Sequence, residues 1–264
     1  MKKSFGQNLL VDNFFLEKII SAVNLKPDDI VVEIGSGSGL LTVLMAKQVK
    51  KVFAVEVERD ILKKLEYNTN QNKLTNIEII ENSFLKIDLA GLSDTPFKVI
   101  GNIPYNLTSK ILIKLFGEPG SPAGHLKYLK DIFLMVQLEV AERLAAQPDT
   151  KAYSPLTILV QYFSDPAILF KVPQTAFMPA PKVESAFVYL KVKPNLQNID
   201  DPVLLKKVIK TAFQQRRKKI INSLEKLYSS KELITQRLKE LNLDHNLRAE
   251  NLNFEDFLRI SDSL

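Results

Sequence analysis

Apolar runs of strand length alternate with helix-length segments over the first three quarters of the chain. Strands are predicted at 29–34, 51–57, 77–80, 97–100, 131–137, 167–172 and 184–192, and helices at 39–49, 59–72, 107–116, 138–146 and 155–163. This alternation is typical of a parallel, doubly wound sheet covered by helices. Because the loop between the last two strands is too short for a crossover helix, we expect one antiparallel strand at the end of the sheet.

A polar segment, PNLQNIDDP (194–202), interrupts this pattern, and every later segment up to about Ser261 is predicted to be helical. That region is too short for a second α/β domain. The sequence therefore predicts an α/β domain over residues 1–195 and a small all-helical domain over residues 196–264.

The composition excludes several kinds of site. The chain has no Cys and only two His, His125 and His245, so we expect no metal centre and no Ser-His hydrolase. We find no signal peptide and no apolar run of about 18 residues, and we expect a cytoplasmic monomer with no membrane segment. The formal net charge of +6 favours a polyanionic partner, although a merely soluble basic protein is the alternative.

A glycine-rich loop, EIGSGSG (33–39), follows the first strand and opens the first helix. Gly35 and Gly37 let the backbone pass close to a ligand at the carboxyl edge of the sheet. The spacing differs from the dinucleotide pattern G-x-G-x-x-G. Glu56, at the end of the second strand, is placed to accept hydrogen bonds from a ribose, and Glu33 would repel a pyrophosphate. These acids favour S-adenosylmethionine, with a ligand-free turn and a nicotinamide cofactor as alternatives.

The segment GNIPYN (101–106) ends the fourth strand with an amide, a rigid proline and an aromatic ring. The side-chain oxygen of Asn102 and the carbonyl of Ile103 are two acceptors that could hold the N–H groups of an exocyclic amine. Pro104 restricts its own backbone and that of Ile103. Tyr105 offers a face on which a base can stack. This pattern predicts methyl transfer to an adenine amine, and a buried turn with a core tyrosine is the alternative.

The chain resembles the small-subunit ribosomal RNA adenine N6,N6-dimethyltransferases, the KsgA/RsmA family, over nearly its whole length. The segments that carry the resemblance are, in order, KKSFGQNLLVD (2–12), VVEIGSGSGLLT (31–42), AVEVERD (54–60), GNIPYN (101–106), MVQLEVAERL (135–144), FMPAPKVESA (177–186), FQQRRKKIINSL (213–224) and LRAENLNFEDF (247–257). The resemblance implies a Rossmann-like class I methyltransferase sheet with a helical C-terminal domain. It also implies S-adenosylmethionine as methyl donor and two adjacent dimethyladenosines near the 3′ end of 16S rRNA as product, formed during ribosome assembly.

The family's contacts carry over onto matching positions. The resemblance implies a cofactor site made by Gln7, Asn8, Leu10, Gly35, Gly37, Glu56, Asn82 and Asn102. It implies that Asn102 also contacts the target amine, that Tyr105 stacks on the adenine, and that Phe177 holds the base from another side unless it is a core residue. The family usually has Asp where this chain has Asn82, so we expect cofactor binding weaker by about 1 kcal/mol.

Residues 203–228 contain eight Lys or Arg against one acid, Glu225. We expect this segment to be a helix that binds rRNA phosphates through Arg216, Arg217, Lys218 and Lys219, and a solvated helix face is the alternative. The target adenine must leave its stack to reach Asn102, so an unpaired or flipped base is implied.

Three other functions compete with this reading. A large-subunit rRNA adenine methyltransferase of the antibiotic-resistance type shares GQN and NIPY patterns, but the RRKK and LRAEN segments favour the small-subunit enzyme. A non-catalytic RNA-binding ribosome-assembly factor is opposed by the intact Glu56, Asn102, Pro104 and Tyr105. A nicotinamide dehydrogenase is opposed by the spacing of the glycine loop.

Overall fold

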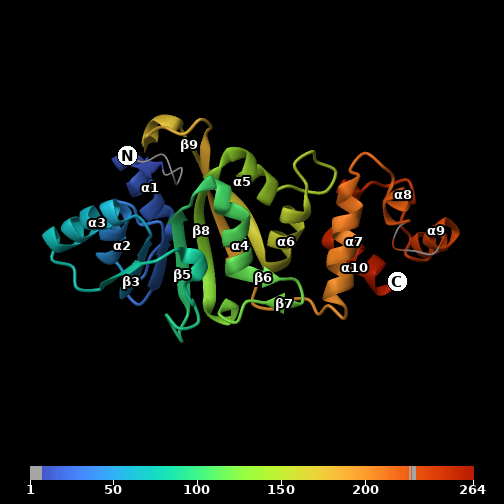
Figure 1. The fold of residues 1–264 in the computed structure, drawn as a ribbon, viewed down its shortest axis with the longest axis horizontal. Helices are drawn as coiled ribbons and strands as arrows, with labels where there is room; N and C mark the ends of the chain where they lie inside the picture. Colours follow the sequence, from blue (N-terminus) through green and yellow to red (C-terminus); the bar gives the residue numbers. More distant parts are fainter. Residues whose placement is uncertain (1–7, 226, 228–229) are drawn as a thin grey trace. The chain divides into compact units, whose positions relative to one another are not determined.

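The computed structural model describes residues 8–225, 227 and 230–264 (Figure 1). The chain forms two compact units. The first holds the residues up to Phe116 together with Ala123–Ala141 and Asp165–Pro194, and the second holds Gly117–Pro122, Glu142–Ser164 and Asn195–Leu264. The last boundary between the units, between Pro194 and Asn195, falls in the polar segment that interrupts the strand pattern. The second unit also takes in two earlier segments that lie within the predicted 1–195 domain.

A seven-stranded sheet forms the centre of the first unit. Its strands in spatial order are β4 (Ile77–Glu81), β3 (Lys51–Glu56), β2 (Ile30–Ile34), β5 (Phe97–Asn102), β8 (Leu129–Gln137), β11 (Ser185–Val192) and β9 (Ser164–Val172). The pairs from β4 to β8 are parallel, whereas β11 is antiparallel to β8. The predicted mostly parallel sheet with an antiparallel last strand is therefore confirmed.

Four helices of this unit accompany the sheet: α1 (Asn13–Val23), α2 (Leu40–Ala46), α3 (Arg59–Gln71) and α4 (Thr108–Phe116). Leu16, Ile19 and Val23 of α1 pack with Met45 of α2 in a core cluster that includes residues of β2, β3 and β8. No helix was predicted at residues 13–23, although Leu16, Ile19 and Val23 recur at helical spacing and are the buried residues of α1. Its start is fixed by Asp12, whose side chain accepts a hydrogen bond from the N–H of Phe14 at 2.9 Å.

The chain reverses its direction of winding between β2 and β5, which are neighbours although β3 and β4 separate them in sequence. Ligands of open α/β sheets bind beyond the carboxyl ends of the strands at such a point. Here Ile34 pairs with Gly101. A Cβ atom on Gly101 would lie 2.7 Å from the carbonyl oxygen of Ile34 and 2.8 Å from its Cβ. The missing side chain thus lets β5 run two residues beyond its predicted end and place Asn102 beside β2.

The second unit contains α6 (Pro155–Phe163), α7 (Pro202–Gln214), α8 (Ile220–Leu224), α9 (Lys231–Glu240), α10 (Phe254–Asp262) and a two-residue hairpin, β6 (Gly117–Glu118) with β7 (Ser121–Pro122). Helix α5 (Leu138–Leu144) spans a division between the units. Helix α6 has Ser154 as its N-cap residue, and helix α7 has Asp201. Each cap is followed by a proline in the first helical turn, a combination that favours the start of a helix. Among the described residues, no helix combines the length and apolar character needed to span a bilayer.

The basic tetrad Arg216–Lys219 does not lie on a helix, contrary to the sequence prediction. Helix α7 ends at Gln214 and α8 begins at Ile220, with a turn between them in which the N–H of Lys218 donates to the carbonyl of Gln215 at 2.8 Å. The buried stripe of α7 is Leu205, Val208, Ile209 and Ala212. If the helix continued, this stripe would carry Arg216 and Lys219 into the core, so the chain turns instead. Lys226, which was counted with the basic segment, lies outside the described residues.

Replacing Gly101 by Ala should destabilise the protein strongly. The added methyl group meets backbone atoms of Ile34 that cannot move without breaking the β2–β5 pairing, and such overpacking costs about 1–3 kcal/mol or more. Urea unfolding measures the change. Gly124→Ala is the matched control, because no atom lies within 4 Å of its added Cβ. Equal stabilities for the two variants would show that the β2–β5 contact is not constrained in this way.

Candidate active site

The glycine loop connects the carboxyl end of β2 to α2 in a sharp turn at the edge of the sheet. Gly35, Gly37 and Gly39 have φ angles of 68°, 57° and 84°, a region that suits residues without a side chain. The N–H of Gly35 donates to the carbonyl of Val55 at 2.9 Å, and Asn68 Nδ2 donates to the carbonyl of Ser38 at 2.8 Å. The loop is thus anchored from both β3 and α3.

The N-terminal segment forms one wall of this region. Strand β1 (Leu9–Leu10) pairs antiparallel with β10 (Phe177–Met178). A Cβ on Gly37 would lie 2.8 Å from Cδ2 of Leu9, so the segment and the glycine loop are in close contact. Asn102 Nδ2 donates to the carbonyl of Asn8 at 2.7 Å. This bond fixes the orientation of the Asn102 amide and leaves Oδ1 as its second polar atom. Gln7 lies outside the described residues.

Two buried carboxyl groups, those of Glu33 and Glu56, face the same region, each residue only 2% exposed. Glu56 Oε2 accepts from the N–H of Gly37 at 3.0 Å, and its Oε1 accepts from the N–H groups of Val57 and Glu58 at 2.8 and 3.0 Å. Glu56 therefore fastens the glycine loop to the end of β3. It also lines the pocket described below, where its carboxylate is available to hydroxyl donors of a ligand.

Glu33, at the end of β2, is buried and bound mainly by a hydroxyl group. Thr42 Oγ1 donates to Glu33 Oε2 at 2.5 Å. Burial raises the pKa of Glu33 to about 8, against the lowering effect of hydrogen bonds from Thr42 and Ser36 and with a smaller raising effect of the Glu56 charge. Without a cation beside it, the Glu33 carboxyl holds a proton at neutral pH, and a cationic ligand group would favour its ionised form.

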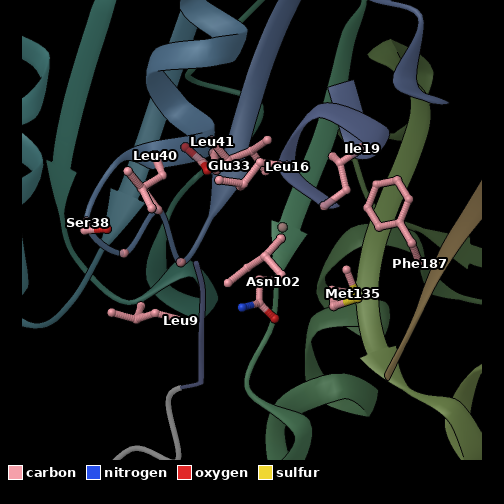
Figure 2. Close-up of a pocket in the computed structure, with 15 residues that line it drawn as sticks. Leu9, Leu16, Ile19, Glu33, Ser38, Leu40, Leu41, Asn102, Met135 and Phe187 are labelled. Atoms are coloured by element: carbon pink, nitrogen blue, oxygen red, sulfur yellow. The ribbon is translucent and has the colours of Figure 1, made fainter. Parts of the chain in front are cut away.

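Two pockets that share Leu9, Gly35 and Asn102 occupy this edge of the sheet, and Figure 2 shows the first of them. The first reaches from Glu33 and the glycine loop to Met135 and Phe187, and the second adds Asn8, Glu56, Ile103, Pro104 and Tyr105. Neither is lined by Lys, Arg or His among the described residues. Two carboxyl groups and no cation suit a ligand with positive charge and no phosphate. S-adenosylmethionine, with its sulfonium and ammonium groups and no phosphate, fits this lining better than a dinucleotide does.

The segment after Asn102 is held by β8 and β11. The N–H of Ile103 donates to the carbonyl of Met135 at 3.4 Å, and Pro104 has φ −59° and ψ 125°. The hydroxyl of Tyr105 forms a 2.6 Å hydrogen bond with that of Ser185. Burial raises the pKa of Tyr105, partly offset by this bond, so its ring stays uncharged and fixed at the pocket.

Most of the predicted site residues come together in the structure, and two do not. Asn8, Leu10, Gly35, Gly37, Glu56, Asn102, Ile103, Pro104 and Tyr105 line one or both pockets. Asn82 is exposed and lines neither; its Oδ1 accepts from the N–H of Ser83 at 2.8 Å. Phe177 is 4% exposed and belongs to the apolar core, which is the alternative that the sequence left open for it.

Other residues of the site were not among the predicted contacts. Leu9 lines both pockets, Thr42 binds Glu33 and Ser185 binds Tyr105. Thr42 and Ser185 lie within the segments that carry the family resemblance, but their partners are 9 and 80 residues away. No local sequence signal indicates such a pairing.

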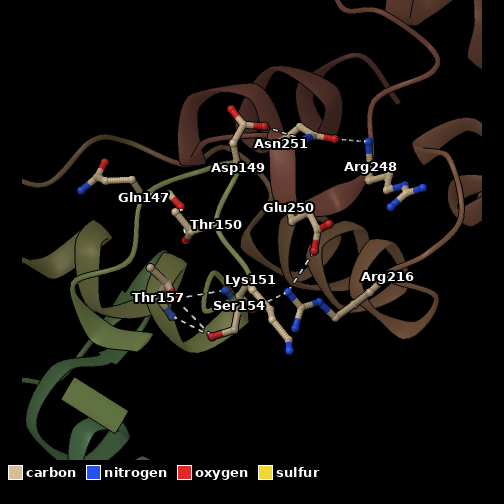
Figure 3. A network of polar contacts seen from close by, with 10 residues as sticks. All are labelled: Gln147, Asp149, Thr150, Lys151, Ser154, Thr157, Arg216, Arg248, Glu250 and Asn251. Carbon is tan, nitrogen blue, oxygen red and sulfur yellow. Dashed lines mark hydrogen bonds and ion pairs between the residues drawn. The ribbon is translucent and has the colours of Figure 1, made fainter. Parts of the chain in front are cut away.

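The predicted RNA-binding residues lie in the second unit, and they differ in whether their side chains bond to other residues of the protein. Arg216 Nη2 donates to Glu250 Oε2 and to the carbonyl of Lys151, both at 2.9 Å (Figure 3). Lys219 Nζ donates to Asn246 Oδ1 at 2.6 Å. Arg217 and Lys218, like the other two, are exposed. The tetrad therefore contains two side chains that make contacts within the protein.

Replacing Glu33 by Gln should flatten the decline of stability with rising pH. The folded protein keeps the Glu33 proton up to a pKa of about 8, whereas the unfolded chain loses it near the ordinary glutamate pKa of 4.5. The folded state binds more protons between these values, so its stability falls as the pH rises through this window, by at most roughly 1.4 kcal/mol per unit of pKa difference. Urea unfolding from about pH 5 to pH 8 measures the slope.

The exposed Glu17 provides the control for this experiment, because Glu17→Gln removes the same kind of group without burial. A Glu33→Gln variant with the pH slope of the unaltered protein would mean that Glu33 is ionised in the folded state.

The family model and the curated relatives point to the same family. The family model described as ribosomal RNA adenine dimethylase matches residues 1–264. A protein of Alkaliphilus metalliredigens named Ribosomal RNA small subunit methyltransferase A is 38% identical over 267 residues, which cover 98% of this chain and 90% of the relative.

Solved structures show the same fold. A dimethyladenosine transferase from Plasmodium falciparum has a TM-score of 0.80 at 27% identity, over 96% of this chain and 95% of that one. The 23S rRNA methyltransferase ErmE has a TM-score of 0.74 at 24% identity, over 97% and 99% of the two chains, a likeness of fold alone. With the family model matched from end to end and the sheet, glycine loop and Asn-Ile-Pro-Tyr segment in place, the chain belongs to the ribosomal RNA adenine dimethylase family.

Proposed function

We propose that this protein transfers methyl groups from S-adenosylmethionine to the N6 amine of adenine, giving N6,N6-dimethyladenosine at two adjacent positions near the 3′ end of small-subunit rRNA. Membership of the family supports the reaction and the cofactor. The observation that carries the proposal is the position of Asn102. It lines both pockets, and its Nδ2 is bound by the carbonyl of Asn8, so its Oδ1 is the atom that can accept from an amine.

The protein's part in the reaction is to orient the amine. Asn102 Oδ1 and the carbonyl of Ile103 accept the two N–H groups of the adenine, which favours a tetrahedral nitrogen with a directed lone pair. The fixed backbone of Pro104 holds that carbonyl in place. When bound, S-adenosylmethionine supplies a methyl group on a positively charged sulfur. Positioning of this kind can contribute roughly 7–11 kcal/mol to lowering the barrier.

Tyr105 provides the surface for the base. Its hydroxyl is held by Ser185, which fixes the ring without using its face. Stacking of a base on such a ring contributes about 1–3 kcal/mol. The methylated nitrogen loses its extra proton readily, so none of these residues needs to act as a strong base.

The C-terminal residues support the choice of substrate. The exposed Arg217 and Lys218 suit an RNA backbone, and the relatives at 35–39% identity carry a small-subunit name. The sheet-bearing unit is the methyltransferase part and the helical region binds rRNA. The protein acts as a monomer in the cytoplasm, and its net charge of +6 accords with an rRNA partner.

Asn102→Ala should lower the rate of methylation by about a hundredfold, the scale of losing one positioning group. The protein is incubated with labelled S-adenosylmethionine and small subunits lacking the modification, and the labelled nucleoside is identified after digestion. The matched control is Asn106→Ala, which removes the same side chain from an exposed position four residues away. Label on large-subunit rRNA in a parallel reaction would support the resistance-type function, and no label at all would oppose catalysis.

A further inference from the structure

Arg216 is already engaged within the protein. Its Nη2 atom donates to the carboxylate of Glu250 and to the main-chain carbonyl of Lys151, both at 2.9 Å. The side chains of the Arg216–Glu250 pair are 42% and 26% exposed. An arginine that binds a carboxylate and a carbonyl at once has lost part of its capacity to bind a phosphate, because the carboxylate both occupies and neutralises it.

The carbonyl that Arg216 binds belongs to the loop 147–153, which is held at further points by the segment that follows Leu247. The N–H of Asp149 donates to the carbonyl of Glu250 at 2.8 Å, and Asn251 Nδ2 donates to Asp149 Oδ1 at 2.6 Å. Asp149 has a φ angle of 70°, which costs energy for a residue other than glycine. The loop therefore depends on these contacts for its shape.

The LRAEN sequence thereby gains a structural role. Glu250 and Asn251 come from this motif, and both hold the loop 147–153 (Figure 3). The loop carries Lys151, which is exposed and whose main-chain carbonyl accepts from Arg216 Nη2 (Figure 3). With its backbone fixed by the guanidinium, Lys151 projects from the surface near the turn that carries Arg217 and Lys218.

We propose that Arg216 is a positioning residue rather than an RNA contact. Together with Glu250 it holds the loop 147–153, so that Lys151 joins Arg217 and Lys218 in binding the phosphates of the rRNA. The inference rests on the proposed function for its RNA partner, whereas the hold on the loop is a property of the protein alone. It adds Lys151 to the RNA-binding surface and removes Arg216 from it.

The Glu250→Gln variant distinguishes loop positioning from phosphate contact, because the two roles of Arg216 predict opposite changes in the affinity for small subunits. If Arg216 positions the loop, the variant weakens binding to unmodified small subunits roughly three- to tenfold, on the scale of one lost interaction. If Arg216 contacts phosphate, the variant frees the guanidinium and removes a negative charge, so binding is unchanged or tighter. The control is Glu240→Gln, which removes an exposed acid of α9 that pairs with Arg237 instead.

Lys151→Gln tests the added contact. The slope of log affinity against log salt concentration should decrease by about 0.7–0.9 for one lost phosphate contact, and an unchanged slope would overturn the assignment of Lys151. Arg216→Gln should weaken binding as Glu250→Gln does.

Hydrogen exchange at the loop amides provides a readout that needs no RNA. Exchange at Lys151 and its neighbours should be faster in Glu250→Gln and Arg216→Gln than in Glu240→Gln, and equal rates would overturn the positioning role. If the unaltered protein fails to bind or methylate subunits, the proposed function fails, and the exchange rates still decide whether Arg216 holds the loop.

Discussion

The close approach of β5 to β2 at Gly101 is the contact on which the active site depends. Ile34 ends its strand opposite Gly101, and the glycine loop begins with the next residue, while Asn102 follows on the other strand. A side chain at position 101 would push these two strand ends apart. Since Asn102 also binds the carbonyl of Asn8, the same contact determines where the N-terminal wall of the pocket lies.

The electrostatics of the site follow from two buried acids at the edge of the sheet and from the lack of basic side chains among the described residues that line the pockets there. Glu33 and Glu56 are both buried there, and no basic side chain lines the two pockets within the described part of the chain. Glu56 is bound by three backbone N–H groups, whereas Glu33 has hydroxyl partners and burial raises its pKa to about 8. The charge of Glu33 can therefore adapt to the ligand, while Glu56 fastens the glycine loop.

The sequence was informative wherever a local pattern decides the structure. Buried parallel strands are continuous apolar runs, so β2, β3 and β8 were located within two residues of their observed ends. Contacts between distant segments were beyond its reach: the β1–β10 pairing and the bond from Ser185 to Tyr105 each depend on tertiary packing. Helix α1 was missed although its buried residues recur at helical spacing. The tetrad Arg216–Lys219 was wrongly placed on a helix, because the prediction followed its charge and did not take account of the buried stripe of α7.

The short ladder between β1 and β10 has a consequence for the exchange of ligands. Within residues 8–225, two residue pairs, Leu9 with Met178 and Leu10 with Phe177, join these strands, and a pairing of this length contributes little stability by itself. Leu9 nevertheless lines both pockets. The cofactor site thus has one wall built into the sheet and one wall held by this ladder, by the N–H groups of Val11 and Asp12 on the carbonyl of Ala176, and by the buried Leu10 and Phe177. Local unfolding of that second wall would open the site from one side while the seven-stranded sheet keeps its pairing.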